Sequence, residues 1–90
     1  MEIEYDNRKA KVNFKKHSVS FDEAATCFHD ELALSIEDVY SRGESRWALI
    51  GMSVRARLIT VVYTVRNDKI RIISARKSTK REIQDYAQRI

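Results

Sequence analysis

The stretch RLITVVYTVRNDKIRIISA (residues 57–75) decides the fold. Residues 57–65 are rich in β-branched side chains and apolar on both faces, which indicates a strand in the middle of a sheet. Asn67 and Asp68 follow as a two-residue hairpin signal, and residues 69–75 then return as a second strand. The stretch therefore predicts an antiparallel hairpin against which the other elements pack.

The second strand of this hairpin leads into a group of cations. Ile70 and Ile72 face one way, and strict alternation continues that side to Arg76. We therefore expect Arg76 to leave the sheet on the side of the two isoleucines, with its guanidinium group curling round the sheet edge.

Three more strands are predicted upstream of the hairpin, each from alternating apolar residues. They are residues 2–5 (EIEY), 32–36 (LALSI) and 46–53 (RWALIGMS). An acidic loop separates the last two strands and contains Gly43, which can take a positive φ.

Two helices are predicted in the first third of the chain. Residues 7–17 form a basic helix with a narrow inner stripe. The stripe consists of Ala10, Phe14 and His17. The second helix begins after Ser20, which has the capping-box spacing to Glu23, and it ends near residues 29–30.

A third helix closes the chain. Thr79 and Glu82 again have the capping-box spacing. Its inner face, which we expect to pack on the sheet, is Ile83, Tyr86, Ala87 and Ile90. The elements predict one α+β domain over residues 1–90 with the order β-α-α-β-β-β-α. About four antiparallel strands would pack with two N-terminal helices and a C-terminal helix.

Length and composition exclude several classes of protein. Ninety residues leave no room for separate cofactor and substrate domains, and we expect no cofactor. The single cysteine allows no internal disulfide and favours a reducing compartment. No stretch approaches the ~18–20 apolar residues that span a bilayer, and the acidic start is unlike a signal peptide. We expect a soluble cytoplasmic protein that does not contact a membrane.

The formal net charge of +4 conceals an uneven distribution. Residues 1–40 contain five Lys/Arg and nine Asp/Glu, whereas residues 41–90 contain twelve and four. A basic half favours an anionic partner, and nucleic acid is the usual one. Surplus basic residues can also serve solubility alone.

The sequence contains no Gly-rich phosphate loop and no metal-binding motif. Cys27 and His29 are two potential metal ligands, but nothing nearby completes a site, so no metal is expected. Cys27 suits a small buried apolar position better than a nucleophile paired with His17 or His29.

Two clusters of cations are candidate anion-binding sites. The first, on the N-terminal helix, is Arg8, Lys9, Lys11, Lys15, Lys16 and His17. The second, around the start of the last helix, is Arg71, Arg76, Lys77, Lys80 and Arg81. Cations at a helix start oppose the helix dipole, which is unusual unless an anion binds there. Strand ends add Arg46, Arg55, Arg57 and Arg66, which either contact phosphate or protect sheet edges.

Four segments resemble the BrnT family of bacterial toxins, in the RelE/ParE-like superfamily of type II toxin–antitoxin systems. They are NFKKHSVSFDEAATCF (13–28), RWALIG (46–51), ITVVYTVR (59–66) and RIISARKSTKREIQDY (71–86). The similarity runs from about Tyr5 to Tyr86. The chain departs from the family at Ser18, where members usually have Gly, and at Met52, where they often have a basic residue.

This resemblance implies a RelE-like fold and a ribonuclease that inhibits translation and growth. It also implies neutralisation by a BrnA-like antitoxin with a ribbon-helix-helix DNA-binding domain. Toxin and antitoxin would form a heterotetramer that represses its own operon by binding operator DNA. A catalytically inactive homologue that binds RNA or the antitoxin is the alternative.

RNA cleavage without a metal uses the 2′-OH as nucleophile and needs groups for proton transfer and cations for the phosphorane charge. The catalytic candidates are His17, Lys16, Arg76 and Glu82. The candidates for RNA or phosphate binding are Arg46, Arg66, Lys77, Arg71 and Lys80. Trp47 and Tyr63 are better suited to core packing than to stacking on a base.

Overall fold

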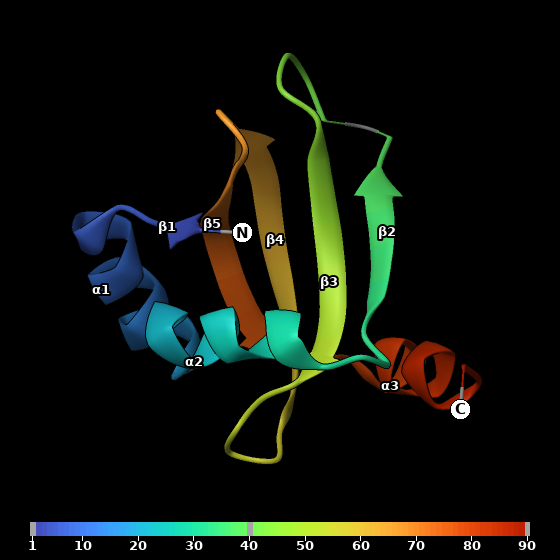
Figure 1. Cartoon of the computed structure of the whole chain (residues 1–90). Helices are drawn as coiled ribbons and strands as arrows, with labels where there is room; N and C mark the ends of the chain where they lie inside the picture. Colours follow the sequence, from blue (N-terminus) through green and yellow to red (C-terminus); the bar gives the residue numbers. More distant parts are fainter. Residues whose placement is uncertain (1, 40, 90) are drawn as a thin grey trace.

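The computed structural model describes residues 2–39 and 41–89, and its centre is a five-stranded sheet (Figure 1). The strands are β1 (Ile3–Glu4), β2 (Leu34–Asp38), β3 (Arg46–Met52), β4 (Leu58–Arg66) and β5 (Lys69–Lys77). They lie side by side in the order β1-β5-β4-β3-β2. The predicted α+β class is confirmed, and so is the order of a first strand, two helices, a run of strands and a last helix. The run contains four strands where the order β-α-α-β-β-β-α has three, so the sheet has five strands, one in each of the five predicted strand segments.

The sheet is mixed, not wholly antiparallel. Strands β2 to β5 form the predicted antiparallel meander, but β1 pairs with β5 in parallel, with Ile3 opposite Ile70. Strands β1 and β5 are far apart in the sequence, because the helices and the other strands come between them. Such a long connection permits a parallel pair. Strand β2 begins two residues later than expected because Asp30 accepts a hydrogen bond from the Leu32 amide and closes a turn there.

Helices lie on both faces and at one edge of the sheet. Helix α2 (Phe21–Thr26) contacts β5 and β4, and the short 3-10 helix η1 (Cys27–His29) continues it over β3. Helix α1 (Asn7–His17) lies beyond β5, and α3 (Lys80–Ala87) lies near the end of β3 (Figure 1). Helix α2 thus covers one face, the first turn of α3 contacts Thr60 and Arg76 on the other, and α1 lies at the edge. Within the described residues, no helix is long and apolar enough to cross a membrane.

The hairpin between β4 and β5 forms at the predicted dipeptide. Asn67 and Asp68 have φ values of 53° and 63°, the left-handed pair that a type I′ turn requires. Arg66 pairs with Lys69 across this turn. The expected positive φ is also found at Gly43, where it is 75°.

A β-bulge interrupts the alternation in β5 and overturns one prediction. Tyr63 pairs with Ile72, but the preceding residue, Val62, pairs with Ser74, so Ile73 is an extra residue. An inserted residue shifts all later side chains to the opposite face. Arg76 therefore lies on the face opposite Ile72, not on the side of the isoleucines as strict alternation predicted.

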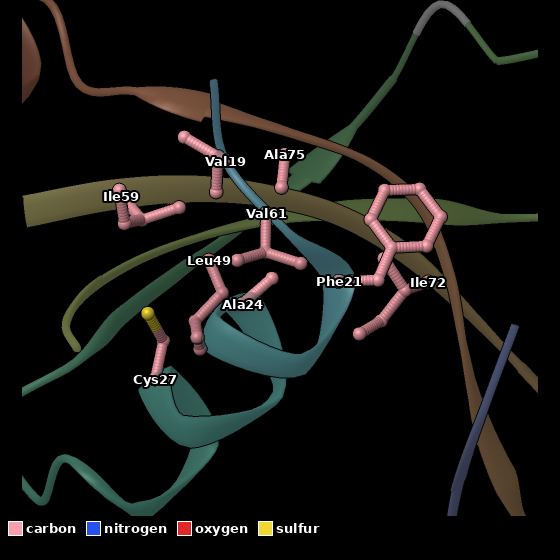
Figure 2. Packing of buried hydrophobic residues seen from close by; sticks show 9 residues of the cluster. All are labelled: Val19, Phe21, Ala24, Cys27, Leu49, Ile59, Val61, Ile72 and Ala75. Carbon is pink, nitrogen blue, oxygen red and sulfur yellow. The ribbon is translucent and has the colours of Figure 1, made fainter. Parts of the chain in front are cut away.

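The core lies between α2 and the sheet (Figure 2). Its buried members are Val19, Phe21, Ala24, Cys27, Leu49, Ile59, Val61, Ile72 and Ala75. Gly51 permits close contact between η1 and β3, because a Cβ atom there would lie 3.0 Å from the Cys27 carbonyl oxygen. Because the core residues of the sheet point towards α2, the residues that alternate with them point to the opposite face.

Helix α1 has the predicted bounds, and of its predicted inner stripe Ala10 and His17 are partly buried, but Phe14 is not. Phe14 is 53% exposed, whereas Asn13 is buried. The Asn13 amide donates to the carbonyl oxygens of Val19 (3.0 Å) and Ala75 (2.8 Å), and its oxygen accepts from the Ala75 N–H (3.1 Å). The asparagine thus pairs with the outer edge of β5 as a neighbouring strand would.

Helix α3 also differs from the prediction. Its capping box is present, with hydrogen bonds in both directions between Thr79 and Glu82. Of the predicted inner face, Tyr86 is buried, while Ile83 and Ala87 are exposed and Ile90 lies outside the described residues. The Tyr86 hydroxyl donates to Asp30 (2.7 Å). The helix is therefore anchored by its first turn and by one tyrosine, not by a whole apolar face.

The turn after α1 gives a first testable prediction. Ser18 is the left-handed C-terminal residue of α1, with φ 58° and ψ 31°. Glycine takes this conformation without the Cβ clash, so we expect Ser18→Gly to raise the free energy of unfolding by about 0.5–1 kcal/mol. Ser18→Ala, which keeps the Cβ atom, should give no gain. Urea unfolding of the three proteins measures this, and an equal gain from alanine would contradict the explanation.

Candidate functional site

The face of the sheet opposite α2 carries the four arginines among the candidate site residues. Arg76 pairs with Thr60 and Arg71 pairs with Thr64, and residues paired directly across a sheet project from the same face. Arg46 and Arg66 lie on this face by the same alternation. We call the surface formed by Arg46, Arg66, Arg71, Ser74 and Arg76 the open face. Thr60 and Thr64 are four residues apart, so its two ends are separated by about 13 Å.

One end of the open face groups three arginines around a carboxylate. Arg66 makes two hydrogen bonds of 3.0 Å with Glu44. This pair, with the charges of Arg46 and Arg71, lowers the pKa of Glu44. Arg71 is also 3.8 Å from Glu4. These pairs are partly exposed, and exposed ion pairs are weak, so a phosphate can compete with the carboxylates.

The other end is built around Arg76 and Glu82. The Arg76 guanidinium binds both oxygens of Glu82, at 2.7 and 3.0 Å. Glu82 also accepts from the Thr79 amide (2.8 Å) and the Thr60 hydroxyl (3.0 Å). Thr60 in turn shares a hydrogen bond with Ser78. Contacts from β4, from α3 and from the connection between β5 and α3 thus fix the direction of one guanidinium group, which leaves its remaining donors for an anion.

The same contacts decide what Glu82 can do chemically. Arg76 first, and then the Thr79 amide and Thr60, lower the pKa of Glu82 to about 2 against the opposing effect of burial. The hydrogen bond to Glu82 raises the pKa of Arg76 in return. A carboxyl group with this pKa is ionised at neutral pH and has no proton to donate.

This lowered pKa predicts a pH dependence of stability. The folded-state pKa lies below the ordinary value of 4.5, so the ionised Glu82 stabilises the fold above that pH. The contribution is lost as the pH falls from about 4.5 towards 2. We expect Glu82→Gln to be less stable than wild type at pH 7, with the difference shrinking below pH 4.5. Urea unfolding across this range measures it; a difference that is independent of pH would contradict the assignment.

Lys16 and His17 lie at the edge of the sheet next to the bulge. With Asn13, Ile73 and Ser74 they line a hollow of about 320 Å³ between α1 and β5. His17 is partly buried, as expected, and Lys16 is exposed. Ser74 belongs to the open face two residues before Arg76, so this hollow adjoins the open face.

The remaining predicted residues lie apart from this arrangement. Lys77 pairs with Ile59 and so projects from the face covered by α2, and Lys80 is exposed in the first turn of α3. Tyr63 stacks on Trp47 with ring centroids 6.0 Å apart and bonds Ser35. Both rings are on the face covered by α2, in agreement with the packing role favoured for them.

Cys27 occupies the small buried position predicted for it. It is 0% exposed, and burial raises the pKa of its thiol to about 12. A neutral, inaccessible thiol is not a nucleophile. Among the described residues, no group of three or more His, Cys, Asp or Glu is placed to hold a metal ion.

The sequence reasoning missed Asn13, Glu44 and Ser74. Asn13 could have been found, since it lies between Ala10 and His17 at helical spacing and shares their inward face. Ser74 could not, because its face is set by the bulge. Glu44 sits in a loop, where no periodicity indicates a direction.

The fold and the site define a small α+β protein whose sheet presents a row of arginines on one face. The model of the BrnT family, described as the ribonuclease toxin of a type II toxin–antitoxin system, matches residues 5–82. The chain therefore belongs to the BrnT family of ribonuclease toxins.

A solved structure has the same fold. The Brucella abortus ribonuclease toxin BrnT, determined by crystallography at 1.1 Å resolution, aligns with a TM-score of 0.67 and 22% identity. The alignment covers 89% of this chain and 99% of the Brucella chain. A comparison with curated protein sequences gave no match.

Proposed function

We propose that this toxin cleaves RNA on the open face without a metal ion. The observation that carries the proposal is the bulge at Ile73, which brings Arg71, Ser74 and Arg76 to one face. Arginine forks suit phosphate oxygens because they bind two at once. Exposed Arg–carboxylate pairs on this face are replaceable by phosphates, which supports a track for the RNA backbone.

The proposed reaction is an internal transfer of the phosphate. The 2′-oxygen attacks the adjacent phosphorus, the bond to the 5′-oxygen breaks, and a 2′,3′-cyclic phosphate and a 5′-OH result. A base takes the proton of the 2′-OH, an acid protonates the leaving oxygen, and a cation stabilises the phosphorane. We assign the cation to Arg76 and the proton transfers to His17 and Lys16, because the hollow they line adjoins the open face.

Glu82 receives a different role in this proposal. Its low pKa argues against proton donation, and its bidentate contact argues for positioning Arg76. Arg46, Arg66 and Arg71 would bind phosphates further along the RNA, and Lys77 and Lys80 would contact the strand as it leaves the sheet.

The proposal extends to regulation, with family membership as its support. The antitoxin would be BrnA-like, with a ribbon-helix-helix domain that binds operator DNA, and two toxins would assemble with two antitoxins in the cytoplasm. Expression in a bacterial host tests the function. Wild-type protein should slow growth and arrest translation, and co-expression of its cognate antitoxin should restore growth.

The variant His17→Ala/Arg76→Ala separates catalysis from binding. We expect normal growth when it is expressed, while circular dichroism and antitoxin binding show that it folds. Growth inhibition equal to that of wild type would contradict the catalytic mechanism. It would favour instead an inactive homologue that acts by binding RNA or the antitoxin.

A further inference from the structure

An apolar groove lies away from the open face, between α1 and the start of α2. It encloses about 720 Å³. Its residues include Tyr5, Ala10, Phe14 and Phe21, with Lys11 and Lys15 from α1. Phe14 is 53% exposed, and its ring has no place in the buried core. A large aromatic side chain left exposed in a hollow is typical of a surface that binds a partner.

The charges around the groove indicate what kind of partner fits. From Asn7 to His17 the sequence of α1 has five Lys/Arg and no acid. Within the groove, the one carboxylate among the lining residues, Asp22, accepts a hydrogen bond of 2.5 Å from Tyr5. Lys11 and Lys15 therefore border the hollow with positive charge. A complementary segment has apolar side chains for the floor and acidic side chains for the rim.

We propose that an acidic amphipathic segment of the cognate antitoxin docks in this groove. The inference rests on the proposed function for the existence of the antitoxin, and the groove supplies the place and the chemistry of the contact. A second copy of this chain would bring a net charge of +4 and an equally basic α1 to the same surface. RNA finds a mainly apolar floor here, whereas the arginine forks are on the open face.

The choice of Phe14 makes the test specific. Among the lining residues, the exposed large apolar side chains are Phe14 and Val12, and Phe14 is the aromatic one. Because its ring lies outside the buried core, replacing it removes little from the fold. Residues of this kind at the centre of a protein interface commonly dominate the affinity. Val54, which is 78% exposed in the loop between β3 and β4, is a matched apolar control outside the groove.

Titration calorimetry with the purified antitoxin tests the proposal. We expect Phe14→Ser to weaken antitoxin binding by about 30-fold or more, with Val54→Ser binding as wild type does. RNA cleavage by free Phe14→Ser should equal that of wild type. Thermal unfolding confirms that each variant folds.

A charge-reversed variant gives an independent second test. Lys11→Glu/Lys15→Glu should bind the antitoxin more weakly than wild type, and the salt dependence of binding should decrease. Unchanged antitoxin affinity in both the Phe14 and the lysine variants would overturn the proposal. So would a Phe14 variant that loses RNA cleavage but keeps its antitoxin affinity, because the groove would then serve RNA.

The two proposals fail separately. If wild-type protein cleaves no RNA but Phe14→Ser still loses antitoxin binding, the docking groove stands and the proposed catalysis falls. If wild-type protein cleaves RNA but Phe14→Ser and Lys11→Glu/Lys15→Glu both bind the antitoxin normally, the proposed catalysis stands and the docking groove falls.

Discussion

Replacing Arg76 with alanine should lower the rate of RNA cleavage by about 10²–10³-fold, the usual loss when one donor to a developing charge is removed. Glu82, itself bonded to Thr60, holds the Arg76 guanidinium group in place. Among the residues that the structure describes, no other side chain is held in the same position, so none can replace its contact with the phosphate. The rate constant for cleavage under single-turnover conditions measures the effect directly.

Two further variants make this result interpretable. Arg76→Lys keeps the charge but not the planar fork, and we expect an intermediate loss. Arg89→Ala removes an exposed arginine outside the open face and should leave the rate near wild type. A rate for Arg76→Ala equal to that of Arg89→Ala would contradict the assignment of the site.

The largest effect on stability is expected at Arg57. The Glu23 carboxylate is 4% exposed, and Arg57 binds both of its oxygens, one through Nε at 2.9 Å. Ser53 donates a further hydrogen bond of 2.7 Å. Arg57 is the main cause of the lowered pKa of Glu23, against the effect of burial. Removing the arginine leaves a buried charge without its partner, so Arg57→Ala should lower the free energy of unfolding by about 3–5 kcal/mol.

The neighbouring Arg55 provides the control. It is also close to Glu23, at 3.8 Å, but its side chain is 68% exposed. Arg55→Ala should therefore lower stability by less than about 1 kcal/mol. Urea unfolding at pH 7 compares the two. Equal losses of stability in the two variants would mean that burial of the Glu23–Arg57 pair contributes nothing. The double variant Glu23→Gln/Arg57→Ala should be more stable than Arg57→Ala, because it also removes the buried charge that has lost its partner.

Local features of the fold could be predicted from the sequence because nearby residues determine them. The Asn67-Asp68 turn and the cap at Thr79 each depend on a few adjacent residues, and both are present. Ser20 also caps α2 as predicted. Its expected partner Glu23 instead turns to Arg57, 34 residues away, since an arginine fork is a stronger partner than a backbone amide.

The candidate site was predictable in composition but not in geometry. Its arginines were found from the sequence, whereas the face on which Arg76 lies depends on one extra residue, Ile73. The bulge lets Ile72 and Ala75, three residues apart, both enter the core. Asn13 bonds the backbone of Ala75 across 62 residues. Its helical spacing with Ala10 and His17 indicates an inward face but not this distant partner. Contacts between residues far apart in the sequence therefore decide which arginines lie together on one face of the sheet.

The most direct test of the account is cleavage of a defined RNA by the purified toxin in EDTA, with the ends of the products identified. We predict cleavage without added metal, products ending in a 2′,3′-cyclic phosphate and a 5′-OH, and no cleavage where the nucleotide at the cut carries a 2′-deoxy sugar. Cleavage that requires a divalent metal ion, or that leaves a 5′-phosphate, would contradict the account.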